Sequence, residues 1–265
     1  MPPPQEQGLA PAPAFLSIIQ HNCLGIWNVF LCLFESFKEA TTYPSIVLLQ
    51  DPPVNKAHLP SFNGFKSFFP PVRLPRVAAY VHMSFLSSYK VLPRFKEVDD
   101  VLALDISSNE PLFGTAFHSF RVINADSTNT ADHKVHSVSP EVLFPDLGFP
   151  LLVLGDLNIH NPLSDRLRYF SHREISSSTP YFEKTAESGF ALLNPAGEHT
   201  RFRLVGNARP SVIDLPFANP PLLPLVKSCE ASLPSTGSDH IPITITLAAP
   251  SLNQEPPRPR WADTD

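Results

Sequence analysis

The sequence Leu151-Leu-Val-Leu-Gly-Asp-Leu-Asn-Ile-His160 predicts the architecture of the whole chain. Its first four residues are all apolar, which is typical of a strand covered on both faces. Gly155 then frees the backbone, and Asp156 and Asn158 follow two residues apart. In extended chain this spacing places both side chains on one face. The stretch therefore predicts a buried strand that presents polar groups at its C-terminal end.

Asp156 and Asn158 have the chemistry for a metal-assisted attack on phosphorus. A carboxylate can hold or deprotonate a water molecule, and a neighbouring carboxamide can orient it. On its own, however, Gly-Asp-x-Asn is equally well explained as a plain strand-to-turn transition, where these residue types are favoured for their backbone conformations. The motif needs a second element before it indicates a function.

A second polar motif stands near the other end of the chain. It reads Thr236-Gly-Ser-Asp-His240, and the alternating strand pattern Ile241-Pro-Ile-Thr-Ile-Thr-Leu247 follows it. Taken alone, the motif is more typical of a loop with a hydrogen-bonded histidine. The two motifs in this order resemble the endonuclease/exonuclease/phosphatase superfamily, whose members close their domain with a strand that opens on Ser-Asp-His.

The resemblance becomes closer at Tyr43-Pro-Ser-Ile-Val-Leu-Leu-Gln-Asp-Pro-Pro53, a predicted buried strand that two prolines terminate. Its end is similar to the endonuclease domains of fungal LINE-type, non-LTR retrotransposons. Most of the superfamily has a glutamate here as the main metal ligand, whereas this chain has Asp51. The missing methylene shortens the reach by about 1.5 Å, while metal–oxygen distances tolerate only about 0.2 Å. Unless the backbone moves or a water fills the gap, we expect weak metal binding.

Two strand ends carry further candidates. Asn22 ends the first predicted strand and by itself suits a turn, but the superfamily uses an asparagine here to bind the catalytic carboxylate or the phosphate. Asn129 matches a family asparagine at the scissile phosphate, whereas Asp126 stands where the family has a tyrosine. A carboxylate about 5 Å from a phosphate costs roughly 3 kcal/mol at an effective dielectric of 20. We therefore expect either a cation between the two charges or an Asp126 that turns to solvent.

Asp214, in Ser211-Val-Ile-Asp-Leu-Pro-Phe-Ala218, also suits a buried strand with one capping acid. In the superfamily an aspartate on this strand pairs with the histidine of Ser-Asp-His. The resemblance implies that Asp214 raises the pKa of His240 and fixes its tautomer, so that the imidazole presents a proton to a phosphate oxygen. Neighbours among Asp156, Asp214 and His240 should then lie within about 4 Å of each other.

The fold that the resemblance implies is an α/β, four-layer α/β/β/α sandwich of two mainly antiparallel sheets, the DNase I-like architecture. The rest of the chain fits this fold, because turn-rich gaps separate short strand patterns and few stretches show helical spacing. Strands are predicted at 15–22, 43–53, 76–81, 89–93, 99–106, 113–124, 151–160, 190–195, 199–204, 211–218 and 241–247. The strands at 76–124 should form a meander, and those at 190–204 a hairpin. Helices are predicted at 25–39 and 179–189, with a short helix or turn at 137–145.

One domain is expected at residues 15–248, because both motifs must meet in it. Residues 1–14 are expected to be a disordered Pro-rich lead, and 249–265 a Pro-rich linker or tail. The formal net charge of −5 gives no global attraction to nucleic acid, so DNA binding would rely on a local basic patch or on metal ions.

The cysteines and the apolar runs indicate the compartment. The three cysteines are widely spaced without a C-x-x-C pair, which argues against a zinc site and a disulfide framework and favours a reducing compartment. The longest apolar run, 26–34, is far shorter than a membrane span, so no membrane association is expected. We expect the protein inside the cell, and in the nucleus.

These inferences combine into one expected function, that of a metal-dependent phosphodiesterase. The resemblance makes it a DNA-nicking endonuclease domain of a retrotransposon, with its activity weakened at Asp51 and Asp126. The expected cofactor is Mg²⁺ or Mn²⁺, and the expected partners are DNA and a reverse transcriptase domain in a longer polyprotein. The predicted site residues are Asp51 and Asp239 as metal ligands, Asn129 and Asp126 at the phosphate, and Asp156, Asn158, His240, Asp214 and Asn22 in catalysis.

Two alternatives stay open. A phosphatase or lipid phosphodiesterase of the same fold is compatible with the acidic net charge, and its substrate profile would distinguish it. A catalytically inactive remnant that at most binds nucleic acid is favoured by Asp51 and Asp126, the two departures from the family pattern.

Overall fold

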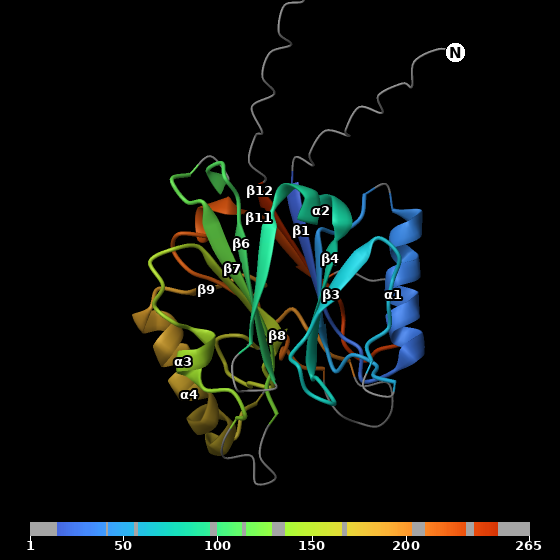
Figure 1. Cartoon of the computed structure of the whole chain (residues 1–265). Helices are drawn as coiled ribbons and strands as arrows, with labels where there is room; N and C mark the ends of the chain where they lie inside the picture. The colour runs from blue at the N-terminus through green and yellow to red at the C-terminus, as the bar shows by residue number, and fades with distance from the viewer. Residues whose placement is uncertain are drawn as a thin grey trace, which may run out of the picture.

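The computed structural model describes residues 15–40, 42–55, 58–95, 100–112, 115–128, 136–165, 169–202, 210–231 and 236–248. The Pro-rich ends expected at 1–14 and 249–265 lie outside these residues. Figure 1 shows two sheets facing each other, with helices on the outer side of each.

In the described part of the chain the two sheets have the same plan, with six strands each and one parallel pair near the middle. The first has the order β11-β12-β1-β2-β4-β3, and the second has the order β5-β6-β7-β8-β10-β9. The pairs β1/β2 and β7/β8 are parallel, and the other neighbours are antiparallel. The strands are β1 (Phe15–Asn22), β2 (Ile46–Gln50), β3 (Phe65–Phe68), β4 (Val77–His82), β5 (Lys90–Phe95), β6 (Val101–Ser107), β7 (Ser119–Asp126), β8 (Leu151–Asp156), β9 (Ala191–Leu192), β10 (Phe217–Ala218), β11 (Val226–Ala231) and β12 (Ile243–Ala248).

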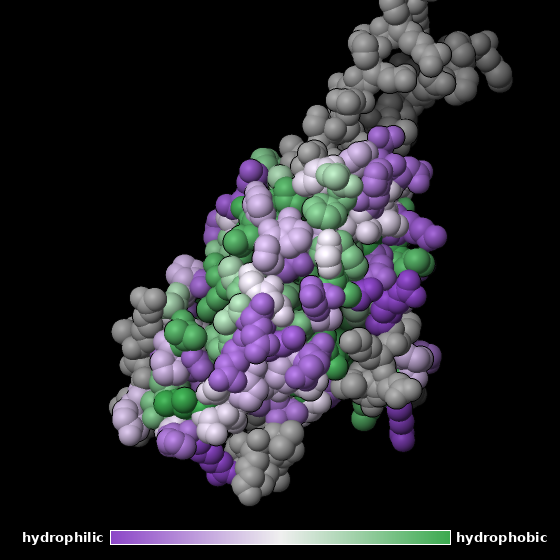
Figure 2. Space-filling view, turned by 90° about the vertical axis from the view of Figure 1, so that its left-hand side faces the viewer, coloured by the Kyte–Doolittle hydropathy of each residue, from purple (hydrophilic) through white to green (hydrophobic). Residues whose placement is uncertain are grey.

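Helices complete the outer layers. α1 (Trp27–Glu39) covers the first sheet, and α3 (Pro140–Leu143) and α4 (His172–Glu187) cover the second, as Figure 1 shows. α2 (Met83–Ser88) follows β4 directly, and a 3₁₀ turn at Leu223–Leu225 leads into β11. On the face turned to the viewer in Figure 2, hydrophilic and hydrophobic residues are interspersed. No helix in the described part of the chain is long and apolar enough to cross a membrane.

Three apolar cores separate the four layers. The central core lies between the sheets, the second lies under α1, and the third lies under α3 and α4. β8 belongs to two of them, because Leu152 and Leu154 face the central core while Leu151 and Val153 face the helices. Burial on both faces explains why this strand is apolar at every position. By the same alternation, Asp156 follows Leu152 and Leu154 onto the face between the sheets.

The structure moves the start of the predicted helix 179–189. α4 begins at His172, where Ser171 and Glu174 form a capping box in which each side chain bonds to the other residue's backbone N–H. Pro180 lies inside the helix instead of at its first turn. The helix begins at the capping box because the box satisfies two N–H groups that would otherwise have no partner. Thr179, the predicted cap, only donates to the carbonyl of Ile175.

Strand pairing differs from the prediction at three places. β4 lies in the first sheet, so only β5, β6 and β7 form the expected meander. β9 pairs with β10 and not with the segment after it, where Arg201 makes isolated bridges to Ser211 and His240. The short β3 and the polar edge strand β11 were not predicted, because neither shows a strong alternating pattern.

Replacing Gly155 by alanine should destabilise the fold. A Cβ at Gly155 would lie 1.9 Å from the backbone oxygen of Ala125, its register partner in the β7/β8 pair. Because rigid backbone cannot give way, we expect a loss of about 3 kcal/mol of unfolding free energy, measured in urea. Gly148→Ala is the control, since its Cβ would meet nothing within 4 Å. Equal stability of the two variants would contradict this close approach of the strands.

Candidate active site

The polar residues of the two motifs meet between the sheets, at the C-terminal ends of β1 and β8. β1 ends at Asn22 and β8 ends at Asp156. Asn22 Nδ2 donates to Asp156 Oδ2 at 3.0 Å, which joins the first sheet to the second. The candidate active site is built around this contact.

Asp156 has the environment of a general base. The residue is only 4% exposed, and its Oδ1 accepts a further hydrogen bond from the backbone N–H of Asn158 at 3.2 Å. Burial, followed by the charge of Asp214, raises the pKa of Asp156 to about 7 against the opposing effects of His240 and of its hydrogen bonds. A carboxylate with a pKa near neutrality suits proton abstraction at physiological pH.

His240 and Asp214 form a buried pair. His240 Nδ1 lies 2.9 Å from Asp214 Oδ2, and Gln20 Nε2 donates to Asp214 Oδ1 at 3.2 Å. Burial lowers the pKa of His240, but the charges of Asp214, Asp156 and Asp239 outweigh it and raise this pKa to about 9. A pKa of about 9 favours the charged imidazole near neutral pH, in which both nitrogens carry a proton.

The second nitrogen of His240 faces the cleft. Nε2 lies 3.7 Å from Asp156 Oδ2 and 3.6 Å from Asp239 Oδ1. The neighbours among Asp156, Asp214 and His240 thus lie within the distance expected from the sequence. The roles assigned to them stay predictions.

Ser238 anchors the Ser-Asp-His motif on β1. Its hydroxyl donates to the backbone carbonyl of Asn22 at 2.8 Å and accepts from the backbone N–H of His240 at 3.1 Å. The serine therefore sets the position of His240 relative to the strand that holds Asp156 in place.

Asp239 has one carboxylate oxygen to spare. Arg201 Nε donates to Oδ2 at 2.9 Å. Oδ1 is buried and has no hydrogen-bond partner among the described residues. Buried polar atoms without a partner are rare and need an explanation, and a carboxylate oxygen is the ligand that Mg²⁺ prefers. Asp239 therefore fits the metal role predicted for it.

Asp51 fits that role less well. Asp51 directly follows β2 and has a φ of 38°, which is uncommon outside glycine. Its Oδ1 lies 3.4 Å from Arg76 Nη2. In the described part of the chain, the group of acids and histidines close enough to share an ion is Asp156, Asp214 and His240. Neither Asp51 nor Asp239 is part of that group, and the role of each as a metal ligand stays a prediction.

Asp126 is buried and does not turn to solvent. It is 1% exposed and pairs in register with Asp156 on the neighbouring strand. Arg76 Nη2 donates to Asp126 Oδ2 at 2.8 Å. Burial and the charges of Asp51 and Asp156 raise the pKa of Asp126 to about 9 in spite of Arg76. A cation does accompany this carboxylate, and it is a side chain of the protein itself.

Asn158 and Asn129 depart from the sequence picture in different ways. The predicted common face of Asp156 and Asn158 is wrong, because the strand ends at Asp156 and Asn158 turns with a φ of 51°. Asn158 Nδ2 donates to the backbone carbonyl of Ser127 at 2.9 Å and ties the turn after β8 to the end of β7. Asn129 lies outside the described residues.

Sequence reasoning missed Gln20 and Arg76. Gln20 had a usable signal, because it follows Leu16 and Ile18 at alternate positions and so had to point into the core between the sheets. Arg76 had no usable signal, since an arginine directly before a strand is as typical of a solvated sheet edge as of a functional site.

Comparison with known proteins supports the superfamily. Residues 125–244 match the model of a family described as endonuclease-reverse transcriptase. No curated protein matches the chain.

Three solved structures share the fold. The endonuclease domain of TRAS1, a telomere-specific non-LTR retrotransposon, has a TM-score of 0.64 and 15% identity, covering 88% of this chain and 98% of that one. The AP endonuclease LMAP from Leishmania major has a TM-score of 0.67 and 15% identity, covering 89% of each chain. An AP endonuclease from Archaeoglobus fulgidus has a TM-score of 0.56 and 16% identity, covering 88% of this chain and 99% of that one.

These likenesses establish the four-layer, DNase I-like fold that the sequence predicts. The family match adds sequence evidence over the part of the chain that contains Asp126, Asp156, Asp214, Asp239 and His240. Fold and family match together support the resemblance seen in the sequence, which is to the endonuclease/exonuclease/phosphatase superfamily and to its retrotransposon endonuclease type.

Proposed function

We propose that this chain is a metal-dependent phosphodiesterase that nicks DNA. The observation that carries the proposal is the geometry around His240, whose Nδ1 is bonded to Asp214 while its Nε2 faces Asp156. A base with a pKa of about 7 and an acid with a pKa of about 9 thus lie side by side. Two titratable groups with pKa values separated in this way suit acid and base roles in one reaction.

The side chains divide the work of hydrolysis between them. Asp156 accepts a proton from the attacking water, and Asn22 holds the carboxylate in place through its 3.0 Å hydrogen bond. His240 donates from Nε2 to a phosphate oxygen and stabilises the charge that develops in the transition state. Asp214 keeps the imidazole oriented and charged.

A bound Mg²⁺ or Mn²⁺ would polarise the phosphate as a Lewis acid. Asp239 would hold it through the carboxylate oxygen that has no hydrogen-bond partner. Asp51 would add a second ligand only after giving up its ion pair with Arg76. The competition between Arg76 and the metal supports weak metal binding and therefore weak activity.

The substrate and the setting belong to the same proposal. The endonuclease-reverse transcriptase family and the fold shared with a retrotransposon endonuclease domain support DNA as the substrate. They also support a reverse transcriptase domain as a partner within a longer polyprotein. Chromosomal DNA as the target places the protein in the nucleus.

An inactive remnant that still binds nucleic acid is the second candidate, and the contacts of Arg76 favour it. Arg76 lies between Asp51 and Asp126 and compensates both charges. If no metal ion displaces it, the protein keeps the superfamily fold and loses the ability to cut.

Purified protein should nick supercoiled plasmid slowly with Mg²⁺ or Mn²⁺ and not at all in EDTA. His240→Gln and Asp156→Asn should each slow nicking by at least about a hundredfold, because each removes a proton-transfer group. His118→Gln is the control, since His118 is exposed just before β7, at the end of that strand opposite Asp126. Full activity in both active-site variants would refute the mechanism. A parent protein that is folded but never nicks would favour the second candidate, the inactive remnant.

The nicking rate should have a bell-shaped dependence on pH. Activity needs Asp156 deprotonated and His240 protonated, so the rate should rise as pH passes about 7 and fall as it passes about 9. Asp214→Asn removes the charge that raises the pKa of His240, so the falling limb should move to lower pH. Asp105→Asn, which alters a carboxylate bound to Arg94 and Arg121, should leave both limbs in place. A falling limb that stays near pH 9 in Asp214→Asn would contradict the role of this pair.

Arg76→Gln should bind Mg²⁺ at least about tenfold more tightly than the parent in calorimetry. The substitution removes a positive charge close to Asp51, and like charges a few ångströms apart repel by several kcal/mol at an effective dielectric of 20. Arg94→Gln is the matched control, because it breaks another arginine–aspartate pair on the second sheet. Equal affinity in parent and Arg76→Gln would remove Asp51 from the metal site.

A further inference from the structure

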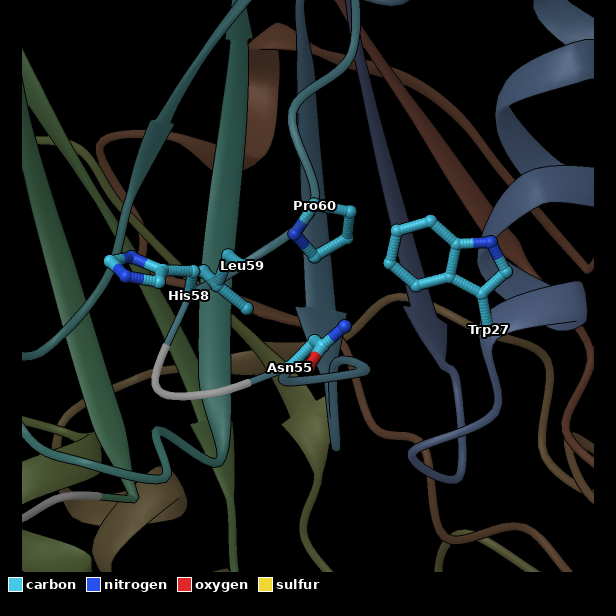
Figure 3. A pocket seen from close by; sticks show the side chains of 5 residues that line it. All are labelled: Trp27, Asn55, His58, Leu59 and Pro60. Carbon is cyan, nitrogen blue, oxygen red and sulfur yellow. The ribbon is translucent and has the colours of Figure 1, made fainter.

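The catalytic mechanism proposed above does not use a pocket that lies beside the proposed active site. Its volume is about 320 Å³, and the described residues that line it are Trp27, Asn55, His58, Leu59 and Pro60. We call it the base pocket. Figure 3 shows the indole of Trp27 opposite the ring of Pro60, with the carboxamide of Asn55 below Pro60 in this view.

The base pocket is built from the chain segments that leave β1 and β2. Gly25 N–H donates to the backbone carbonyl of Asp51 at 2.7 Å, so the two segments are joined directly after the strands end. Trp27 opens α1 two residues after Gly25, and Asn55 follows Asp51 by four residues. Both walls of the pocket are therefore attached to the strand ends that carry Asn22 and Asp51, the metal side of the proposed site.

The shape of the pocket is set by backbone bonds. Asn55 and His58 exchange two backbone hydrogen bonds, of 3.0 and 2.9 Å, which fix these two residues relative to each other. Their side chains are free to face a ligand, since both residues are exposed. Pro60 is buried and accepts a hydrogen bond from the hydroxyl of Tyr80 at 2.7 Å through its carbonyl, which fixes the opposite wall.

Trp27 is the feature that points to an occupant. It is 46% exposed, although α1 buries its other large aromatic residues against the first sheet. An exposed indole beside a phosphate-cleaving site is a stacking platform, because every nucleobase offers a flat π-face. The carboxamide of Asn55 adds one donor and one acceptor, the combination that matches the edge of adenine. None of the five lining residues is a carboxylate that would repel the phosphates.

We propose that the base pocket receives one unstacked nucleobase of the DNA strand that is cut, with Trp27 stacking on the base and Asn55 bonding to its edge. Adenine is the preferred base. The inference rests on the proposed nuclease function and deepens it, because it names the part of the protein that selects the nucleotide next to the scissile phosphate.

The test measures DNA binding in EDTA, where no cleavage occurs, at one fixed salt concentration. Three short duplexes are compared, one fully paired, one with a single bulged adenine and one with a bulged abasic nucleotide. The parent should bind the adenine bulge on the order of tenfold more tightly than the abasic bulge, the range expected for one stacked base. Trp27→Ala should abolish that difference, and Trp27→Phe should retain most of it.

Two further variants sharpen the result. A fourth duplex, with a single bulged thymine, is added for Asn55→Ala. This variant should keep the preference for a base over an abasic site but lose the preference of the parent for adenine over thymine. Tyr43→Ala is the matched control, because Tyr43 is also exposed, at 44%, but precedes β2 at its other end. This variant should behave like the parent.

Equal binding of the two bulges by the parent, an undiminished preference in Trp27→Ala, or no DNA binding at all would overturn the base pocket. The base pocket and the nuclease proposal are tested separately, because the nuclease proposal is decided by nicking with Mg²⁺. A preference for the bulged base without nicking keeps the pocket and removes catalysis. Nicking without that preference removes the pocket alone.

Discussion

The hydrogen bond from Asn22 to Asp156 is the contact on which the site depends, because it joins the two sheets where their strands end. Gln20 and Gln50 make the same kind of contact to Asp214 and Asn124 on the opposite side. A buried polar group without its partner costs about 1–3 kcal/mol. Any sliding of one sheet over the other would break several of these contacts together. The amides of the first sheet therefore hold the acids of the second in position.

The balance of charge decides what the assembled site can do. Asp51, Asp126, Asp156, Asp214 and Asp239 converge at one end of the sandwich, and the structure sets Arg76, Arg201 and His240 against them. These three positive groups do not cancel five acids. A phosphate can enter only if acids stay protonated or a further cation arrives. The raised pKa of Asp126 is an example of the first solution, and the carboxylate oxygen of Asp239 that has no hydrogen-bond partner suits the second.

The sequence was sufficient for what depends on pattern and chemistry. The strand at 151–156, the helix after Gly25 and the meeting of Asp156 with His240 all follow from burial on two faces, helical spacing and the need of one motif for the other. What it could not supply were contacts between residues far apart in sequence. Arg76 bonds to Asp126, 50 residues away in the sequence. β9 pairs with β10, although the sequence predicted a hairpin with the segment 199–204. Such contacts and pairings depend on three-dimensional packing, which no local sequence pattern encodes.

Asp126 has to be understood together with Arg76 and not as an isolated defect. A carboxylate that is 1% exposed, beside Asp156 and near Asp51, would be costly as a lone charge. The 2.8 Å contact with Arg76 and the raised pKa relieve that cost in two ways, by pairing and by protonation. The pair therefore forms a stable unit, and the guanidinium that contacts Asp126 also lies 3.4 Å from Asp51 Oδ1. Under the proposed function, the accommodation of Asp126 and weak metal binding at Asp51 would have one physical cause.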